Sequence, residues 1–431
     1  MCDFTAYQPS ALKAAVIFPD INGDKLSLLP DARLEEACGL AAAINLAIEH
    51  REIITLKHPK AATLISQGSI DKLKNIIAAS GIELVIFDTS LSPVQQRNLE
   101  NALNVKVIDR TALILEIFGH RAQTKEGKLQ VELAHLTYQR SRLVRSWTHL
   151  ERQRGGSGFL GGPGETQIEL DRRIIDRKIL RLKKDLEQVK KTRAIQRNSR
   201  RRVSYPQVVF VGYTNAGKST LFNLLSGSNV LAKDMLFATL DAHLRKIELP
   251  MGHAIILSDT VGFISDLPHE LIMSFRATLE EVVAADLIVH IRDAASPNFH
   301  QQKQDVLAVL KTLELEQTIN SPCYIEVLNK TDLLPPKQAA LLKQHLKSNQ
   351  VAVSSLTGEG IGELLALIES HIAASAQIIE LDLSPSDGQT YAWLYANAQV
   401  LNIRPWQNML HLTIKAEPEI IAKLQKKGLL K

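Results

Sequence analysis

The sequence predicts an α/β multidomain protein in which a helical hairpin connects two α/β domains. Its 431 residues are enough for about two to four domains that each bury a core. Over most of the chain, short apolar runs rich in β-branched residues alternate with helical patterns, which is typical of parallel sheets covered by helices. In a middle segment, apolar residues instead recur at alternating steps of four and three, which indicates helices packed along a seam.

Residues 1–125 are predicted to form an N-terminal α/β domain. Ser92 and Pro93 mark a helix start, because serine caps free N–H groups and proline fits the first helical turn. The alternation of strands and helices predicts a parallel sheet, and spacing alone indicates no catalytic constellation in this domain. The candidate strands are residues 15–18, 53–56, 84–87 and 105–108.

Residues 126–203 are predicted to form a coiled-coil-like two-helix hairpin with a glycine-rich tip. A first helix is expected over about residues 128–145 and a longer one from near Glu165, with the glycine-rich residues 155–164 between them. This seam is short enough to close within one chain, so we expect a monomer. It consists of Ile175, Ile179, Leu182, Leu186 and Val189.

The hairpin also carries a concentrated excess of positive charge. Residues 139–202 contain about 19 Lys or Arg and about 7 Asp or Glu, whereas the whole chain has a net charge of +5. A solvated helix face is the ordinary explanation of such a charge run, and a flexible linker that of the glycines. Four arginines flank the tip, however, which favours contact with RNA phosphates. They are Arg152, Arg154, Arg172 and Arg173.

Residues 204–375 are predicted to form a Ras-like P-loop domain. The segment Gly212-Tyr-Thr-Asn-Ala-Gly-Lys-Ser219 follows an apolar strand and fits the phosphate-binding pattern G-x-x-x-x-G-K-[ST]. Its glycines let backbone N–H groups surround a phosphate, and Lys218 supplies a charge for the β- and γ-phosphates. The residues expected to hold phosphate are Gly212, Asn215, Ala216, Gly217, Lys218, Ser219 and Thr220.

A magnesium ion is expected beside these phosphates. The Ser219 hydroxyl and the Asp259 carboxylate, which follows a second apolar strand, are oxygen ligands of the kind that Mg²⁺ prefers. Thr239 lies between them in sequence and is predicted to reach Mg²⁺ and the γ-phosphate when GTP is bound, although a polar residue in a surface loop is the simpler interpretation. Gly262 is expected to lend an N–H to the γ-phosphate. Lys218, Thr239 and Gly262 are therefore the predicted catalytic residues.

Guanine recognition is predicted from Asn329-Lys-Thr-Asp332, which follows an apolar strand. The Asp332 carboxylate can accept hydrogen bonds from the ring N–H and the exocyclic amine of guanine, whereas adenine would leave it unpaired at a cost. The stem of Lys330 can lie along the base. Backbone N–H groups of Ser354 and Ser355 are expected at the guanine oxygen.

Phe263 follows Gly262, at the position where many GTPases carry a glutamine that orients the attacking water. A phenyl ring has no donor or acceptor for that task. We therefore expect slow hydrolysis by the isolated protein, with the water positioned by another group or by a partner. A purely structural role for Phe263 would explain its packing but would leave hydrolysis without its usual water-orienting residue.

The remaining residues, 376–431, are predicted to form a small α+β domain in which Trp393 and Trp406 belong to the core. Cys2, Cys38 and Cys323 lie far apart without metal-ligand spacing, which is typical of a reducing cytoplasm. No apolar run is long enough to span a bilayer. We expect a cytoplasmic protein that neither inserts stably into membranes nor binds DNA.

These segments resemble the HflX family of ribosome-associated GTPases over nearly the whole chain. Within the hairpin the resemblance rests on Gly161-Gly-Pro-Gly-Glu-Thr-Gln167 and Asp171-Arg-Arg173. In the nucleotide domain it rests on Asp259-Thr-Val-Gly-Phe263, including the hydrophobic residue in place of glutamine, and on Leu267-Pro-His269. The remaining matches are Val107-Ile-Asp-Arg110 and Gly127-Lys-Leu-Gln-Val-Glu-Leu133.

The resemblance implies a GTPase that binds the large ribosomal subunit, with the glycine-rich tip near the peptidyl-transferase region. Family members split or rescue stalled ribosomes, and the ribosome stimulates their GTP hydrolysis. Some relatives are described as using ATP through the N-terminal domain, where they carry a glycine- and lysine-containing stretch. This chain has Ile65-Ser-Gln-Gly-Ser69 there, so we assign no second nucleotide activity.

Two other functions are compatible with the same residues. A GTPase of subunit maturation or RNA modification would bind precursor subunits or free tRNA, and sedimentation of the bound species distinguishes it. A non-catalytic scaffold would use GTP as a structural ligand, and multiple-turnover hydrolysis with purified ribosomes would exclude it.

Overall fold

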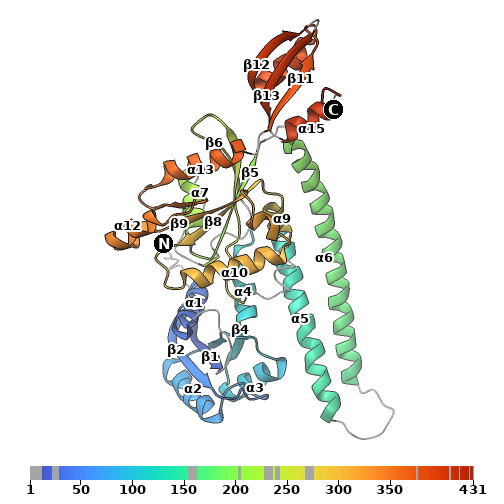
Figure 1. Ribbon diagram of the computed structural model, residues 1–431. Helices are drawn as coiled ribbons and strands as arrows, with labels where there is room; N and C mark the ends of the chain where they lie inside the picture. Colours follow the sequence, from blue (N-terminus) through green and yellow to red (C-terminus); the bar gives the residue numbers. More distant parts are fainter. Residues whose placement is uncertain are drawn as a thin grey trace, which may run out of the picture.

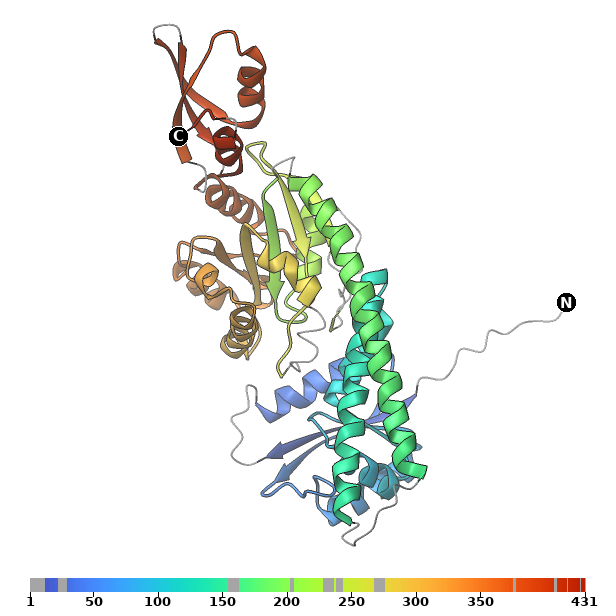
Figure 2. The ribbon, with the colours of Figure 1, turned by 90° about the vertical axis from the view of Figure 1, so that its right-hand side faces the viewer.

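The described part of the chain contains three separate sheets and a long helical hairpin (Figures 1 and 2). The N-terminal sheet lies at one end, the six-stranded sheet in the middle and the C-terminal sheet at the opposite end. The mixed α/β architecture predicted from the sequence is therefore confirmed. The computed structural model describes residues 12–21, 29–153, 163–201, 205–227, 236–237, 243–266, 276–374, 377–406, 409–416, 418–426 and 428–430.

The N-terminal domain is a four-stranded parallel sheet in the order β2-β1-β3-β4. Helices α1 and α4 share a core with one face of the sheet, and α2 and α3 with the other. The strands are β1 (Lys13–Ile21), β2 (Ala47–Leu56), β3 (Leu84–Phe87) and β4 (Lys106–Asp109). The helices are α1 (Pro30–Ala42), α2 (Gln67–Ser80), α3 (Pro93–Leu103) and α4 (Arg110–Arg121).

The hairpin consists of α5 (Lys125–Gln153) and α6 (Pro163–Arg201), which lie side by side along the molecule (Figures 1 and 2). Ile179 and Leu182 of the predicted seam are buried and pack with Leu136 of α5. The expectation that the first helix spans residues 128–145 was too short, because no glycine or proline lies between residue 145 and the glycine-rich segment to end the helix. The predicted tip falls largely outside the described residues.

The central domain has a six-stranded sheet in the order β10-β9-β8-β5-β7-β6, in which β6 runs antiparallel to β7 and the other described pairs are parallel. Its strands are β5 (Gln207–Gly212), β6 (His243–Glu248), β7 (Ala254–Asp259), β8 (Leu287–Asp293), β9 (Tyr324–Asn329) and β10 (Gln350–Ala352). The carboxyl ends of its parallel strands share one edge, which is where ligands of such sheets bind.

Helices cover both faces of the central sheet. Residues of α7 and α13 join the core on one face, and residues of α9 and α10 join the core on the other. That second core continues into α1 and α4 of the N-terminal domain, so the two domains share one hydrophobic cluster. The helices are α7 (Lys218–Ser226), α9 (Arg276–Val283), α10 (Phe299–Thr312), α11 (Glu316–Ile319), η1 (Thr331–Leu333), α12 (Pro336–Gln344) and α13 (Ile361–Ala374).

The C-terminal domain is an antiparallel three-stranded sheet with two helices and a core of its own. Trp393 packs against this core, as predicted, whereas the side chain of Trp406 lies outside the described part of the chain. No helix in the described part is long and apolar enough to cross a bilayer. The elements are β11 (Gln377–Leu383), α14 (Gly388–Asn397), β12 (Gln399–Trp406), β13 (Met409–Ala416) and α15 (Pro418–Lys426).

Candidate nucleotide-binding site

The P-loop connects β5 to α7 and needs its two glycines for different reasons. A Cβ on Gly212 would lie 2.2 Å from the carbonyl oxygen of Ile291 on the neighbouring strand. Gly217 has a φ of +90°, and a Cβ there would lie 2.2 Å from Nδ2 of Asn329. Any larger residue would therefore push β8 or the Asn329 amide away. These contacts keep the loop against the strands that carry the other predicted site residues.

Lys218 is the first residue of α7 and is buried. Its Nζ donates to the carbonyl oxygen of Tyr213 at 2.8 Å, which holds the ammonium group within the loop. Burial lowers the pKa of Lys218 to about 8, while the Asp259 carboxylate acts in the opposite direction. A desolvated ammonium group of this kind gains from an anionic phosphate, which would restore its usual pKa.

Ser219 and Asp259 lie together, as the metal prediction requires. The Ser219 hydroxyl at the start of α7 donates to Oδ2 of Asp259 at the end of β7, at 2.7 Å. Asp259 is fully buried. A hydroxyl and a carboxylate oxygen at this separation fit the hard oxygen ligands of Mg²⁺, which binds few protein groups beside phosphates.

The segment after β7 lies directly against the P-loop. A Cβ on Gly262 would be 2.9 Å from Cγ2 of Thr214 and 3.0 Å from Nζ of Lys218, so only glycine leaves room between them. Thr239, the predicted switch threonine, lies outside the described residues. Of the other loop residues, Ala216 is buried, whereas Asn215 and Thr220 are exposed.

The predicted guanine residues meet at the ends of β9 and β10. Oδ1 of Asn329 accepts from the backbone N and the hydroxyl of Ser355, both at 3.0 Å, and its Nδ2 donates to the Ala216 oxygen at 2.9 Å. Asn329 thereby joins the guanine segments to the P-loop. Asp332 is held by the Ser354 hydroxyl, which donates to Oδ1 at 2.6 Å.

The sequence predicts that Ser354 and Ser355 present backbone N–H groups to the guanine oxygen. Their backbone N–H groups are engaged within the protein, because Ser354 N donates to the Glu359 oxygen at 3.0 Å and Ser355 N donates to Asn329. In this arrangement both serines orient the side chains of Asn329 and Asp332. Sequence spacing predicted that the two serines lie near the guanine-binding residues. It did not predict which groups accept from their backbone N–H groups, because the turn that follows the serines places Glu359.

Asp293 belongs to this corner of the site and was missed by the sequence analysis. Its carboxylate lies at the end of β8, and Oδ2 is 2.8 Å from Nζ of Lys330. Lys330 itself has a φ of +63°, an uncommon conformation for a long side chain. The ion pair therefore fixes where the Lys330 stem lies. A carboxylate at the end of an apolar strand was the signal that could have identified it.

Phe263 lies inside the protein, with 1% of its surface exposed. It belongs to the hydrophobic cluster that also contains Leu40 and Phe118 of the N-terminal domain. Its backbone N donates to the Gly212 oxygen at 3.0 Å, and its oxygen accepts from Thr214 N at 2.7 Å. The backbone at residue 263 is thus paired with the P-loop, while the side chain points into the interdomain core.

Two of the four predicted RNA-binding arginines can be placed with their side chains. Arg172 and Arg173 are exposed on α6 and pair with acids one turn away, at 4.0 Å to Asp176 and 2.7 Å to Glu169. Exposed pairs of this kind contribute little to stability, so both guanidinium groups remain accessible. The Arg152 side chain and the whole of Arg154 lie outside the described residues.

The P-loop, the Ser219–Asp259 pair and the Asn329–Asp332 corner at one sheet edge define a P-loop GTPase. Family models agree along the chain: "GTP-binding GTPase N-terminal" matches residues 31–119, and "GTP-binding GTPase Middle Region" matches residues 121–200. The model described as "50S ribosome-binding GTPase" matches residues 207–330, and "HflX C-terminal domain" matches residues 339–408.

The relatives identify the family. GTPase HflX of Magnetococcus marinus is 45% identical over 91% of this chain and 90% of its own length. GTPase HflX of Escherichia coli is 42% identical over 81% of this chain and 82% of its own. A Sulfolobus solfataricus GTP-binding protein solved with GDP is 23% identical, with a TM-score of 0.45 over 84% of this chain and 98% of its own. The chain belongs to the HflX family of GTPases.

Proposed function

We propose that this GTPase binds the large ribosomal subunit and separates stalled or idle ribosomes into subunits. The observation that carries the proposal is the basic hairpin, which exposes Arg172 and Arg173 on α6 in a chain that also carries the candidate guanine-nucleotide residues. Membership of the HflX family and the "50S ribosome-binding GTPase" match over residues 207–330 support the same partner. We further propose that the protein acts as a cytoplasmic monomer, with domain boundaries near residues 125, 203 and 375.

GTP would bind across the carboxyl edge of the central sheet. Backbone N–H groups of the P-loop and the Lys218 ammonium face the phosphates, and Asp332 accepts from the guanine edge while Asn329 ties that corner to the P-loop. Ser354 and Ser355 hold these two side chains in place. The nucleotide-binding residues in this proposal are Gly212, Asn215, Ala216, Gly217, Lys218, Ser219, Thr220, Asp259, Gly262, Asn329, Lys330, Asp332, Ser354 and Ser355.

Ser219, Asp259 and Thr239 would hold Mg²⁺, which when bound neutralises charge on the phosphate oxygens. Gly262 would direct its N–H at the γ-phosphate, since its backbone lies against Thr214 and Lys218. Lys218 would balance the charge that moves towards the leaving phosphate oxygen. These groups bind and orient GTP without a general base among them.

Hydrolysis would wait for the ribosome. Phe263 cannot orient a water molecule, because its ring is buried in the hydrophobic core that the two domains share and has no polar atom. The isolated protein would then hold GTP long enough to engage its target. A group supplied on the ribosome would complete the site, and hydrolysis would release the factor.

The first experiment measures steady-state GTP hydrolysis by the protein alone and with small subunits, large subunits and intact ribosomes. We expect stimulation by large subunits and by intact ribosomes. Light scattering should report dissociation of intact ribosomes with GTP but not with GDP. Stimulation by none of these would contradict the proposal and favour a role in subunit maturation or other RNA metabolism.

The hairpin is tested by reversing Arg172 and Arg173 to Glu. We expect weaker binding to large subunits and a smaller salt dependence, because about two phosphate contacts are lost, while GTP hydrolysis without ribosomes is retained. The matched control reverses Lys311 and Lys337, which are exposed on α10 and α12 and change the net charge equally. An equal loss of binding in both variants would mean that net charge, not the hairpin, determines docking.

A further inference from the structure

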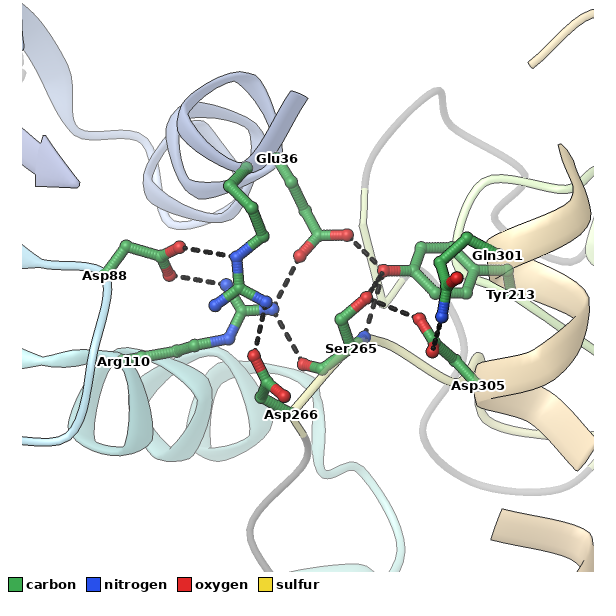
Figure 3. Close-up of polar contacts among 9 residues, drawn as sticks. Glu36, Asp88, Arg110, Tyr213, Ser265, Asp266, Gln301 and Asp305 are labelled. Carbon is green, nitrogen blue, oxygen red and sulfur yellow. Dashed lines mark hydrogen bonds and ion pairs between the residues drawn. The ribbon is translucent and has the colours of Figure 1, made fainter. Parts of the chain in front are cut away.

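A buried polar cluster joins the N-terminal domain to the central domain (Figure 3). We call it the interdomain cluster. Its members come from α1, the residue after β3 and α4 on one side, and from the P-loop, the segment after Gly262 and α10 on the other. They are Arg33, Glu36, Asp88, Arg110, Tyr213, Ser265, Asp266, Gln301 and Asp305.

Arg110 anchors the N-terminal side of the interdomain cluster. It is buried and donates to Asp88 at 2.5 Å, to Glu36 at 2.6 Å and to the carbonyl oxygen of Ser265 at 2.9 Å. The two carboxylates keep the pKa of Arg110 above its usual value despite burial. A permanently charged group therefore holds the Ser265 carbonyl, three residues beyond Gly262. Removing it would take the described ion-pair partner from the largely buried Glu36 carboxylate, whereas Asp88 would keep its ion pair with Arg33.

On the central-domain side of the interdomain cluster, the main contact is made by Tyr213 of the P-loop. Its hydroxyl donates to Glu36, accepts from the backbone N of Ser265 at 2.9 Å and lies 2.7 Å from the Ser265 hydroxyl. Ser265 in turn donates to Asp305 of α10 at 2.7 Å. Burial raises the pKa of the Tyr213 phenol, and the Glu36 carboxylate raises it further, so the phenol stays protonated as a donor.

The backbone of Tyr213 contacts the groups that face GTP. Its carbonyl oxygen holds the Lys218 ammonium at 2.8 Å, and residues 213 and 263 form a parallel bridge between the P-loop and the segment after β7. The side chain contacts the N-terminal domain, while the main chain contacts the phosphate lysine and the neighbour of Gly262. A shift of the phenol would move these groups together.

The N-terminal domain also contacts the segment that precedes Thr239. Phe237 is buried with its ring edge-on to Phe118 of α4, at 4.8 Å between centroids. Phe237 has a φ of +55°, an uncommon conformation for a bulky residue that tertiary contacts must maintain. The N-terminal domain therefore contacts the chain close to both Thr239 and Gly262, the residues expected to face the γ-phosphate.

We propose that Tyr213 is a positioning residue for GTP hydrolysis, through which Glu36 of the N-terminal domain holds the segment after Gly262 against the P-loop. The proposal uses the GTPase activity of the family and does not depend on ribosome binding. When the groups around GTP are already held in place, the reaction does not have to supply the free energy of ordering them. Tyr213 contacts Lys218 through its backbone carbonyl oxygen, which Tyr213→Phe retains, so we expect GDP affinity to be preserved when only the phenol contact is lost.

The test compares Tyr213→Phe, Glu36→Ala and Glu36→Gln in the full-length protein without ribosomes. Single-turnover hydrolysis of GTP, GDP affinity and thermal unfolding are measured for each. We expect Tyr213→Phe and Glu36→Ala to slow hydrolysis about tenfold, which corresponds to about 1.4 kcal/mol, with GDP affinity unchanged. Glu36→Gln keeps an acceptor for the phenol and should restore most of the rate.

The double variant distinguishes positioning from general destabilisation. If Tyr213 and Glu36 act through one contact, Tyr213→Phe combined with Glu36→Ala should be about tenfold slower rather than about a hundredfold. Tyr324→Phe is the control, because its buried phenol bonds His290 and makes no described contact with the interdomain cluster. An unchanged rate in Tyr213→Phe, a parallel loss of GDP affinity or additive losses would overturn the proposal.

Discussion

Replacing Asp332 with Asn tests guanine recognition with a magnitude that follows from the structure. The Ser354 hydroxyl donates to Oδ1 of Asp332 at 2.6 Å, so an asparagine would keep its oxygen there and turn its NH₂ group towards the base. That group faces the ring N–H and exocyclic amine of guanine, donor against donor. Both charge-assisted hydrogen bonds are then lost, rather than weakened.

The expected cost is about 3 kcal/mol, from two hydrogen bonds to a charged group at about 1.5 kcal/mol each. This corresponds to about a 150-fold rise in the Kd for GDP. Xanthosine diphosphate should gain affinity, because xanthine carries a carbonyl oxygen where guanine carries the exocyclic amine. The asparagine NH₂ group can donate to that oxygen.

Competition with a fluorescent guanine nucleotide measures both affinities. Asp71→Asn, an exposed change of the same chemistry on α2, is the control and should leave both affinities as they are. Thermal unfolding checks that the Asp332 variant is folded. A GDP affinity within about twofold of the original, or a loss for GDP without a gain for the xanthine nucleotide, would refute the assignment.

Two further predictions concern buried groups of the central domain. Phe263→Gln should lower the unfolding free energy by about 1–3 kcal/mol without faster hydrolysis, because the amide would be buried away from GTP; faster hydrolysis at an unchanged melting temperature would contradict the observed orientation. Burial lowers the pKa of His290 to about 3. The folded state then binds fewer protons than the unfolded chain below about pH 6.5, so stability should fall by about 1.4 kcal/mol per pH unit from there towards pH 3. Urea midpoints at pH 7 and pH 5 should show less acid sensitivity in His290→Gln, and an identical dependence would exclude this role.

Local patterns predicted much of the secondary structure. The strand predicted at residues 84–87 coincides with β3 (Leu84–Phe87), and α3 begins at Pro93 with Ser92 as its cap. The cap is part of a reciprocal pair, because Gln95 also bonds the backbone of Ser92. Such features depend on neighbours in sequence and can therefore be read from sequence. The length of α5 was underestimated, because the helix continues to Gln153, close to the glycine-rich segment that ends it.

The candidate nucleotide-binding residues were predicted from sequence patterns. Phosphate, metal and guanine each need particular side chains at short, fixed spacings, and those spacings are visible in a single chain. Their meeting at one sheet edge follows from the parallel arrangement, because carboxyl ends of parallel strands share an edge. Asp293 escaped because its role depends on pairing with Lys330, which follows a different strand, β9.

By itself, the sequence predicted the residues that would bind a guanine nucleotide and determined which segment carries a concentrated positive charge. The tertiary structure decided that Tyr213 of the P-loop meets Glu36, 177 positions away, and that Phe263 faces the N-terminal domain rather than the nucleotide. The physical reason is the packing of two independent sheets through α1, α4 and α10. Contacts across such an interface depend on the relative placement of whole domains, which no local spacing encodes.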